Sequence, residues 1–200
     1  MYIQNSNLTI RDATADDAKQ LAEWWNDGAV MAHAGFPLGL GTTAEKVAES
    51  LALDRDDTRR RLIIKVDSVR VGEMSYRRVD TVKSNTAADA GNTAKASDPQ
   101  AADMPLTQTA EIGIKICNPE YQNRGIGKQL LRMLISELFR MGYQRIILDT
   151  NLKNTRAQHV YEQLGFRRLR FNIDSWRDQL GEPQSSIDYE LCQSDFTVTD

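Results

Sequence analysis

Residues 122–127, with the sequence Gln-Asn-Arg-Gly-Ile-Gly, carry the clearest chemical signal in the chain. A helical pattern begins near Gly125. The first N–H groups of a helix have no intrahelical partner and lie at the positive end of its dipole, so they attract anions. Glycines at 125 and 127 let a phosphate approach the backbone, and Arg124 and Lys128 add positive charge. The stretch therefore predicts a site for a phosphate or pyrophosphate.

The same glycines would also permit a sharp strand-to-helix turn without a ligand, and a six-residue pattern does not separate the two interpretations. Two common phosphate loops are excluded. The stretch lacks the Gly-Lys-Ser/Thr ending of a nucleoside-triphosphate loop. It also lacks the third glycine and the acidic residue about twenty positions later that a dinucleotide-binding fingerprint requires. The pattern present is Q-x-x-G-x-G.

Regular elements on both sides would position this loop. Alternating apolar residues predict a strand over 111–116, which an Asn-Pro pair ends. Apolar residues at helical spacing predict an amphipathic helix from about 126 to 141. A second strand is predicted over 145–150, and a shorter helix from about 154 to 164.

This order of elements resembles the GNAT N-acetyltransferases. The resemblance covers residues 111–168 closely, and the opening residues 8–13 are consistent with it. It implies an α/β (α+β) three-layer fold with helices on both faces of a mixed, mostly antiparallel sheet of about seven strands. The strands 111–116 and 145–150 would run parallel and splay apart. The residues that carry the resemblance are the Asn-Pro turn, Q-x-x-G-x-G, Asn154, Val160-Tyr161-Glu162 and Leu164-Gly165-Phe166.

In that family the loop holds the pyrophosphate of acetyl-coenzyme A, and the splayed strand pairs through its backbone with the pantetheine arm. The family's asparagine contacts the cofactor, and its tyrosine lies beside the sulfur. Asn154 and Tyr161 are two helical turns apart and share one helix face, which matches this pattern. The cofactor-binding residues implied are Ile114, Lys115, Ile116, Gln122, Asn123, Arg124, Gly125, Ile126, Gly127, Asn154 and Tyr161.

Acetyl transfer to an amine also needs a proton donor and a proton acceptor. A tyrosine with a pKa of roughly 10 stays protonated at neutral pH, so Tyr161 is the candidate acid; alone it would be an ordinary packing residue. An alkyl ammonium, with a pKa also of roughly 10, must lose a proton before it reacts. Glu111 and Asp149 are the candidate bases, directly or through water. For each, a structural role at a strand end is an equal alternative.

Length and composition favour one domain over residues 1–200. The net charge of −3 gives no general electrostatic case for nucleic acid. No basic start with an apolar run and no eighteen consecutive apolar residues occur, so a cytoplasmic protein without a membrane segment is expected. Cys117 and Cys192 have no metal-type spacing with the two histidines, and neither a metal site nor a disulfide is expected.

The N-terminal half gives weaker signals. A strand is predicted over 8–11, helices over 14–28 and 44–53, and a hairpin of strands over 62–66 and 69–79. The predicted buried stripe of the first helix consists of Ala18, Leu21, Ala22 and Trp25.

Three further segments are less regular. The stretch 29–42 is apolar but interrupted by Gly and Pro, and it reads equally as a wall of the acceptor pocket or as a cover over the core. Residues 80–108 are rich in Ala, Thr, Asp and Ser and predict a long inserted loop between two strands. Strands are predicted over 166–174 and 186–192, with a polar loop over 176–182.

The functional hypothesis is an acetyl-CoA-dependent N-acetyltransferase that transfers the acetyl group directly in a ternary complex. The acceptor would be a primary amine, on a small molecule or a protein N-terminus. Two alternatives remain: a catalytically weak acyl-CoA-binding or regulatory module on the same fold, and a phosphate-loop enzyme unrelated to acetyl transfer. A homodimer paired through the C-terminal strands is compatible with the sequence.

Overall fold

The structure, a computed structural model, describes residues 1–54, 58–79 and 108–197. Residues 80–107 of the predicted insertion lie outside this part. In chain order the elements are β1 (Tyr2–Asn5), β2 (Leu8–Asp12), α1 (Ala18–Asn26), α2 (Gly28–Met31), α3 (Ala44–Leu53), β3 (Arg59–Val66), β4 (Val69–Val79), β5 (Thr109–Ile116), α4 (Ile126–Arg140), β6 (Arg145–Asn151), α5 (Thr155–Gln163), β7 (Arg167–Arg177) and β8 (Pro183–Cys192).

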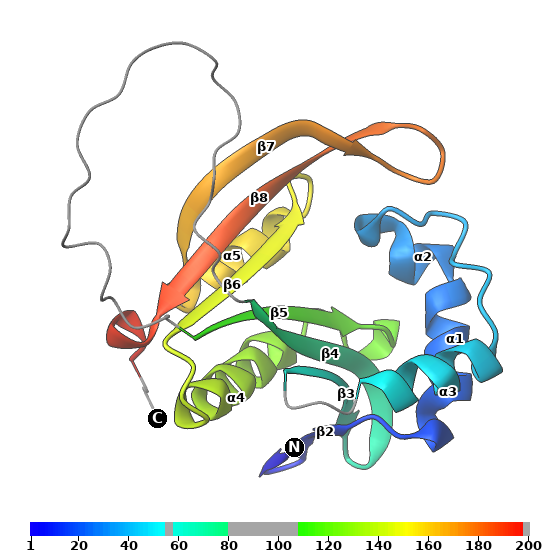
Figure 1. The fold of residues 1–200 in the computed structure, drawn as a ribbon, viewed down its shortest axis with the longest axis horizontal. Helices are drawn as coiled ribbons and strands as arrows, with labels where there is room; N and C mark the ends of the chain where they lie inside the picture. Colours follow the sequence, from blue (N-terminus) through cyan, green and yellow to red (C-terminus); the bar gives the residue numbers. More distant parts are fainter. Residues whose placement is uncertain (55–57, 80–107, 198–200) are drawn as a thin grey trace, which may run out of the picture.

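A single sheet with strand order β1-β2-β3-β4-β5-β6-β8-β7 forms the centre of the molecule (Figure 1). Its neighbouring strands are antiparallel except for the pair β5 and β6. The predicted mixed, mostly antiparallel class is confirmed, but the described part has eight strands instead of about seven. The additional strand is β1. Its residues Tyr-Ile-Gln-Asn are mostly exposed and lack apolar alternation, so nothing in their pattern indicated a strand.

The parallel pair separates after a short contact. β5 pairs with β6 from Thr109 to Glu111. Beyond Glu111, β5 continues to Ile116 against β4, while β6 continues against β8. The edge of β5 that faces β6 therefore has no ladder partner in β6 from Ile112 to Ile116. The predicted splay of these two strands is confirmed.

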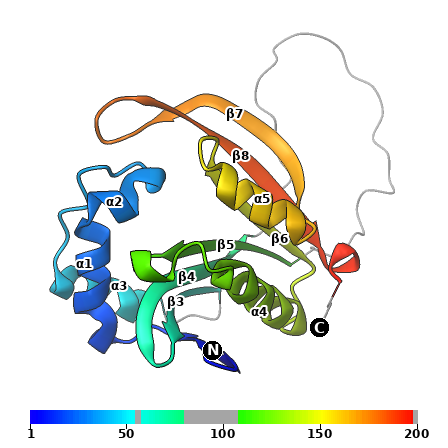
Figure 2. The same ribbon diagram turned by 180° about the vertical axis from the view of Figure 1, so that it is seen from behind.

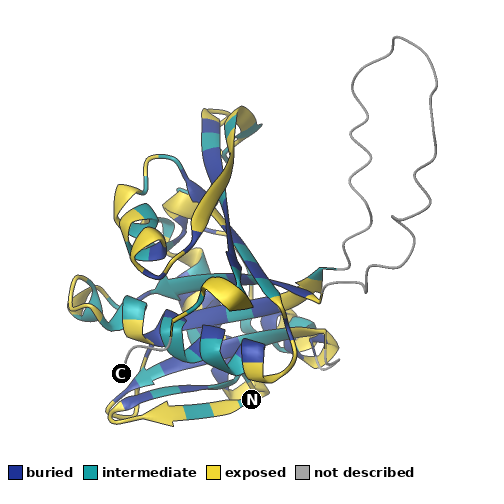
Figure 3. Ribbon diagram, turned by 90° about the vertical axis from the view of Figure 1, so that its left-hand side faces the viewer, coloured by how far each residue is buried: buried dark blue, intermediate teal, exposed yellow. Residues whose placement is uncertain are grey.

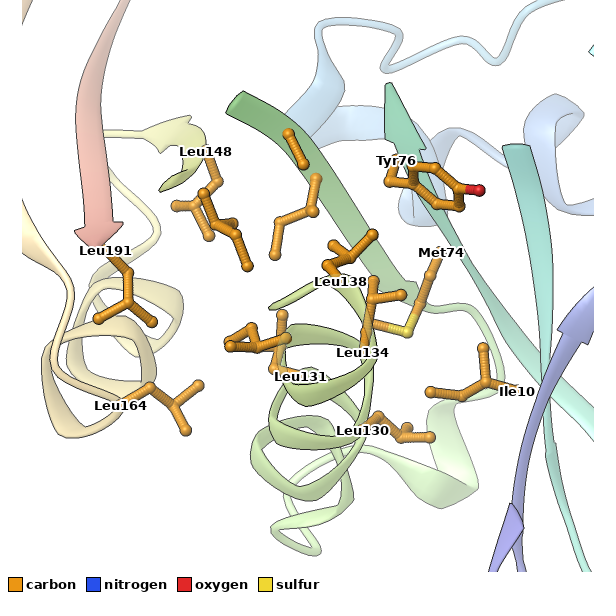
Figure 4. Packing of buried hydrophobic residues seen from close by; sticks show 14 of the residues in the cluster. Ile10, Met74, Tyr76, Leu130, Leu131, Leu134, Leu138, Leu148, Leu164 and Leu191 are labelled. Atoms are coloured by element: carbon orange, nitrogen blue, oxygen red, sulfur yellow. The ribbon is translucent and has the colours of Figure 1, made fainter. Parts of the chain in front are cut away.

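Helices cover both faces of the sheet (Figure 2). The apolar stripe of α4 packs with α5 into the larger core on one face, where Leu134 is fully buried (Figure 4). Truncating such a side chain to alanine costs about 2–5 kcal/mol. On the other face, α1 and α3 form a smaller cluster with Ile63. Since Leu62 and Ile64 belong to the larger core, successive side chains of β3 point alternately into the two hydrophobic clusters.

The start of the first helix follows the prediction. Thr14 and Asp17 form a capping box around a short 3-10 turn that leads into α1. The Asp17 carboxylate also accepts hydrogen bonds from Arg11 and Arg70. Burial would raise the pKa of Asp17, but these bonds and one from the Thr14 backbone outweigh it and hold the pKa well below its usual range.

The predicted buried stripe of this helix was wrong at one position. Trp24 is buried, whereas Trp25 is half-buried and its Nε1 donates a hydrogen bond to Glu73 at 2.9 Å. Both indoles fit the helical spacing. Trp25 still packs against the smaller cluster, with its indole N–H held by the buried Glu73 carboxylate.

The C-terminal hairpin reaches across to the N-terminal half. β7 runs to Arg177, so the predicted loop over 176–182 begins two residues later than expected. The strand carries the exposed apolar residues Leu169, Phe171 and Ile173. Figure 3 marks exposed residues along the outer part of the hairpin. At the other side, part of the stretch 29–42 is helical, because α2 and a 3-10 turn over Ala32–Ala34 precede the left-handed Gly35. The tip of the hairpin meets this stretch directly.

Candidate active site

A cleft of about 870 Å³ opens between the splayed strands and extends from the glycine loop to α2. All of the candidate catalytic and cofactor-binding residues named from the sequence line it. They are Glu111, Ile114, Lys115, Ile116, Gln122, Asn123, Arg124, Gly125, Ile126, Gly127, Asp149, Asn154 and Tyr161. The structure thus brings together side chains from β5, β6, α5 and the loop before α4.

The glycine loop presents open backbone to this cleft. Gly125 caps α4 in the left-handed conformation, with φ 75°. A Cβ atom built on Gly125 or on Gly127 would meet no atom within 4 Å. The first-turn N–H groups of α4 have no intrahelical acceptor. The loop therefore combines unobstructed space with the positive end of a helix dipole, which suits a diphosphate.

Cations surround the loop without filling it. Arg124 lies over the ring of Tyr121 at 5.6 Å from the ring centroid. Lys128 Nζ donates to Gln163 Oε1 at 3.0 Å, which ties α4 to α5. Arg156, at the start of α5, donates to Asn123, which holds a positive φ of 59°. These contacts leave positive charge on both sides of the open backbone.

Gln122 is tied to its own neighbourhood. Its backbone N–H donates to Pro119 O at 3.1 Å, and its side-chain Nε2 donates to Ile116 O at 2.9 Å. The side chain therefore braces the end of β5 against the glycine loop. Since the N–H of Gln122 is engaged, this donor is not available to a ligand.

Tyr161 lies at the inner end of the cleft on the α5 side of the sheet. Its ring packs against Phe166 and Tyr189, with centroid separations of 5.9 and 5.7 Å. Burial, followed by the negative charge of Asp149 and the neighbouring Tyr189, raises the pKa of the Tyr161 phenol well above its ordinary value. The hydroxyl is therefore fully protonated at neutral pH.

Asp149 and Glu111 differ in their surroundings. Arg77 donates to Glu111 Oε2 through Nε at 3.0 Å and Nη2 at 2.6 Å. Asp149 forms no ion pair among the described residues and is exposed to the cleft. Partial desolvation by the cleft, then the negative charges of Glu111 and Asp188, raise the pKa of the Asp149 carboxyl.

The register of the sheet explains this repulsion. Asp188 on β8 lies directly opposite Asp149 on β6. Asp188 is neutralised from its other side, because Arg170 and Asn172 donate to its two oxygens at 2.9 and 2.8 Å. Within the described part of the chain, Asp149 is thus a carboxylate without an ion pair, next to two carboxylates that have cationic partners.

Asn154 serves as the N-cap of α5. Its Oδ1 accepts a hydrogen bond from Ala157 N at 3.2 Å, so the oxygen is used by the helix. Asn154 lines the cleft, whereas the exposed His159 on the same helix does not. The two-turn spacing to Tyr161 holds, since both residues border the cleft.

A buried carboxylate on β4 was missed by reasoning from the sequence. Glu73 is 1% exposed and accepts hydrogen bonds from Trp25, Arg61 and Lys115, at 2.9, 2.9 and 3.1 Å. Burial raises the pKa of Glu73, but the charges of Arg61 and Lys115 outweigh it and hold the pKa below its usual value. A charged residue at a strand position that should be buried was the available signal. Its partners come from three other elements and could not be identified.

The far end of the cleft is closed by the contact between the hairpin and the stretch 29–42. Ala29, Val30, His33 and Ala34 line the cleft on one side and Trp176 on the other. Gln179 clasps the opposite loop: its side chain accepts from Leu38 N at 2.9 Å and donates to Gly39 O at 3.0 Å. Its backbone N–H donates to Gly35 O at 2.8 Å. We refer to these contacts of Gln179 as the clasp.

Cys117 follows β5 in surroundings that disfavour a nucleophilic thiolate. Burial raises the pKa of its thiol to about 12, with the charge of Glu73 as the next cause. Within the described ranges, no group of three or more His, Cys, Asp or Glu side chains forms a metal-binding cluster. Likewise, no helix in residues 1–54, 58–79 and 108–197 is long and apolar enough to span a membrane.

Comparisons with known proteins agree with this geometry. A family model described as Acetyltransferase (GNAT) domain matches residues 7–167. The [ribosomal protein bS18]-alanine N-acetyltransferase of Escherichia coli K12 is 41% identical over 49 residues, which cover 24% of this chain and 33% of the relative. N-alpha-acetyltransferase 30 of Dictyostelium discoideum is 28% identical over 65 residues, covering 32% and 35%. The matched segments span about a third of these curated relatives.

Solved structures share the whole fold at low identity. The spermidine N-acetyltransferase of Vibrio cholerae, solved with CoA and spermine, has a TM-score of 0.74 and 19% identity, covering 96% of this chain and 98% of that one. The ribosomal L7/L12 alpha-N-protein acetyltransferase RimL, solved with coenzyme A, has a TM-score of 0.71 and 15% identity, covering 96% and 98%. At these identities the likeness establishes the fold.

Proposed function

The chain belongs to the GNAT acetyltransferase family, and from this premise we propose that it transfers an acetyl group from acetyl-coenzyme A to a primary amine. The observation that carries the proposal is the open backbone at Gly125–Gly127, which leads into the gap between β5 and β6 that Tyr161 borders. Acetyl-coenzyme A would supply the activated acetyl thioester. The chain's own residues would bind it, aim it and move the protons.

The residues present fit the proposed cofactor. The space beside Gly125 and Gly127 admits a diphosphate, and the N–H groups of the first turn of α4 would hold it. Arg124, Lys128 and Arg156 would add charge around it. The backbone of Ile114–Ile116 has no partner in β6 and would pair with an extended, amide-containing arm. Asn154, which lines the same wall, would contact this arm.

Tyr161 would act as the general acid. The departing thiolate needs a proton, and the phenol is protonated at neutral pH, as its pKa lies above its ordinary value of about 10. Its ring is fixed by Phe166 and Tyr189, so the hydroxyl would be held in one orientation.

Asp149 would act as the general base. Its carboxylate forms no ion pair among the described residues, and its raised pKa brings it closer to that of the amine proton it would accept. Glu111 is the weaker candidate, since its carboxylate is already ion-paired with Arg77, which donates two hydrogen bonds to Oε2. We assign Glu111 the role of neutralising Arg77 at the point where β5 and β6 separate.

Two measurements test this proposal. Isothermal titration with acetyl-CoA reports binding at the glycine loop, and release of the CoA thiol in a panel of primary amines reports transfer. We expect both. Binding without thiol release from any amine would indicate an acyl-CoA-binding module, and absence of binding would reject the assignment of the loop.

A further inference from the structure

The acceptor end of the cleft carries a cluster of two cations and one anion that the proposed chemistry does not use. It consists of Arg61 on β3, Glu73 on β4 and Lys115 on β5. All three residues line the cleft. They lie on the sheet face that α1 and α3 cover, because Arg61 shares its face of β3 with Ile63, and Glu73 lies opposite Ile63 and Lys115.

The cluster presents positive charge to the cleft. The Glu73 side chain is 2% exposed, and its oxygens already accept three hydrogen bonds. The side chains of Arg61 and Lys115 are 27% and 31% exposed, and each spends one described hydrogen bond on Glu73. A guanidinium has five N–H donors and an ammonium has three. The buried carboxylate thus fixes two partly exposed cations that line the cleft, and the cluster has a net charge of one positive unit. The Arg61 guanidinium also lies over the Trp25 ring, 4.9 Å from its centroid.

Asp149 provides the opposite charge on the same face. It alternates along β6 with Leu148, which belongs to the core under α4 and α5, so its side chain projects to the α1 side. Ile147 pairs with Glu111, Asp149 lies two residues further along β6, and Lys115 lies four residues beyond Glu111. Lys115 is therefore roughly 7 Å further along the strand direction, which is about the length of two extended residues.

We propose that the acceptor is an amine that carries peptide-like carbonyl groups, as a peptide N-terminus does, and that Arg61 and Lys115 donate hydrogen bonds to a carbonyl oxygen. This rests on the proposed function, in which Asp149 receives the amine. Along the strand direction, the second carbonyl of an extended chain would come level with Lys115, and the chain would cross the gap between β5 and β6 to meet the cations. A polyamine would instead bring its second ammonium against the two cations, where like charges repel.

The experiment measures kcat/KM for three acceptors over the same range of concentrations: trialanine amide, n-hexylamine and spermidine. The first has carbonyls, the second has a neutral apolar body, and the third has further cations. We expect kcat/KM to decrease in that order. Preference for spermidine over trialanine amide would overturn the inference while leaving acetyl transfer intact. Absence of thiol release from all three, with acetyl-CoA still bound, would instead reject the proposed function.

A charge variant tests the cations themselves. In Arg61→Gln we expect KM for trialanine amide to rise roughly 10- to 100-fold, the effect of losing a hydrogen bond to a charged group, with little change in kcat. KM for hexylamine should stay within a few-fold. Lys65→Gln is the matched control, because Lys65 is on the same strand and does not line the cleft. Equal losses for both acceptors in Arg61→Gln would contradict the inference.

Glu73→Gln provides a second route if the first variant fails to fold. The amide oxygen can still accept from Trp25 and Lys115, while the cluster gains one positive charge. We expect KM for spermidine to rise at least tenfold relative to that for trialanine amide. A lower KM for spermidine in Glu73→Gln would overturn the inference. Arg61→Lys, which keeps the positive charge, should retain most of the activity toward trialanine amide that Arg61→Gln loses.

Discussion

Tyr161 and Asp149 approach the same cleft from opposite faces of the sheet. Tyr161 projects from α5 into the core on one face, and Asp149 points to the face covered by α1 and α3. The gap between β5 and β6 joins the two sides, and the Asp149 charge contributes to the raised pKa of Tyr161. A proton donor and a proton acceptor therefore border one opening from its two ends.

The first prediction concerns Asp149. We expect Asp149→Asn to lower kcat/KM at neutral pH by about 10²–10⁴, because the amine loses its proton acceptor. Since the pKa of Asp149 is raised, the wild-type rate should rise as pH increases through that pKa, and this acidic limb should vanish in the variant. Steady-state rates across a pH series measure both effects.

Glu111→Gln discriminates between the two carboxylates. Because Glu111 is held by Arg77, we expect its loss to reduce kcat/KM by less than tenfold. A larger loss in Glu111→Gln than in Asp149→Asn would reverse the assignment of the base.

The second prediction concerns Tyr161. Tyr161→Phe keeps the packed ring but removes the proton, so kcat should fall by about 10²–10⁴ while the Kd of acetyl-CoA stays the same. Tyr189→Phe is the control: its hydroxyl donates to Glu162 at 3.1 Å and does not border the cleft. A loss of less than a few-fold in Tyr161→Phe would exclude the acid role.

The third prediction concerns the glycine loop. Gly127→Glu should abolish acetyl-CoA binding in calorimetry, because its side chain would place bulk and negative charge in the open space beside the backbone. Gln129→Glu adds the same charge to an exposed position of α4 that does not line the cleft, and it should bind nearly as well as the parent. Undiminished affinity in Gly127→Glu would remove the loop from the site.

The fourth prediction concerns the closed end of the cleft. A Cβ on Gly35 would lie 2.4 Å from Trp176 Cζ3, whereas a Cβ on Gly142 would meet nothing within 4 Å, although both glycines have φ above 90°. Gly35→Ala and Gly142→Ala should each lose about 1–2 kcal/mol of unfolding free energy from backbone strain. Gly35→Ala should lose more unfolding free energy than Gly142→Ala, because its Cβ would also clash with Trp176. Gly35→Ala should also raise the KM of the acceptor.

Denaturant unfolding and steady-state kinetics separate these two effects. The Kd of acetyl-CoA should be the same in both variants, because the clasp lies at the acceptor end. Gln179→Ala should reproduce the change in acceptor KM without backbone strain. Equal acceptor KM values in all three variants would show that the closed end does not contact the acceptor.

Local patterns were sufficient for the elements around the loop. The alternation of Ile112, Ile114 and Ile116 and the helical spacing after Gly125 depend on neighbours in sequence, and both elements formed where expected. β1 could not be foreseen, because edge strands with exposed side chains need no apolar alternation. The long β7 was underestimated for the same reason.

The sequence could not predict those parts of the site that depend on contacts between residues far apart in the chain. The candidate bases Glu111 and Asp149 are equivalent in sequence, and the pairing of one of them with Arg77 follows from the register of β4 and β5. The cluster around Glu73 joins residues from α1, β3, β4 and β5, and the clasp joins residues 140 positions apart. No local pattern encodes such contacts.

The most direct test of the central claim is mass spectrometry of a primary amine incubated with the protein and acetyl-CoA, together with thiol release. We expect a singly acetylated amine formed in step with free CoA, at a rate that Tyr161→Phe and Gly127→Glu both reduce. Free CoA without acetylated amine, or product formed equally well by the Gly127→Glu variant, would contradict acetyl transfer at this cleft.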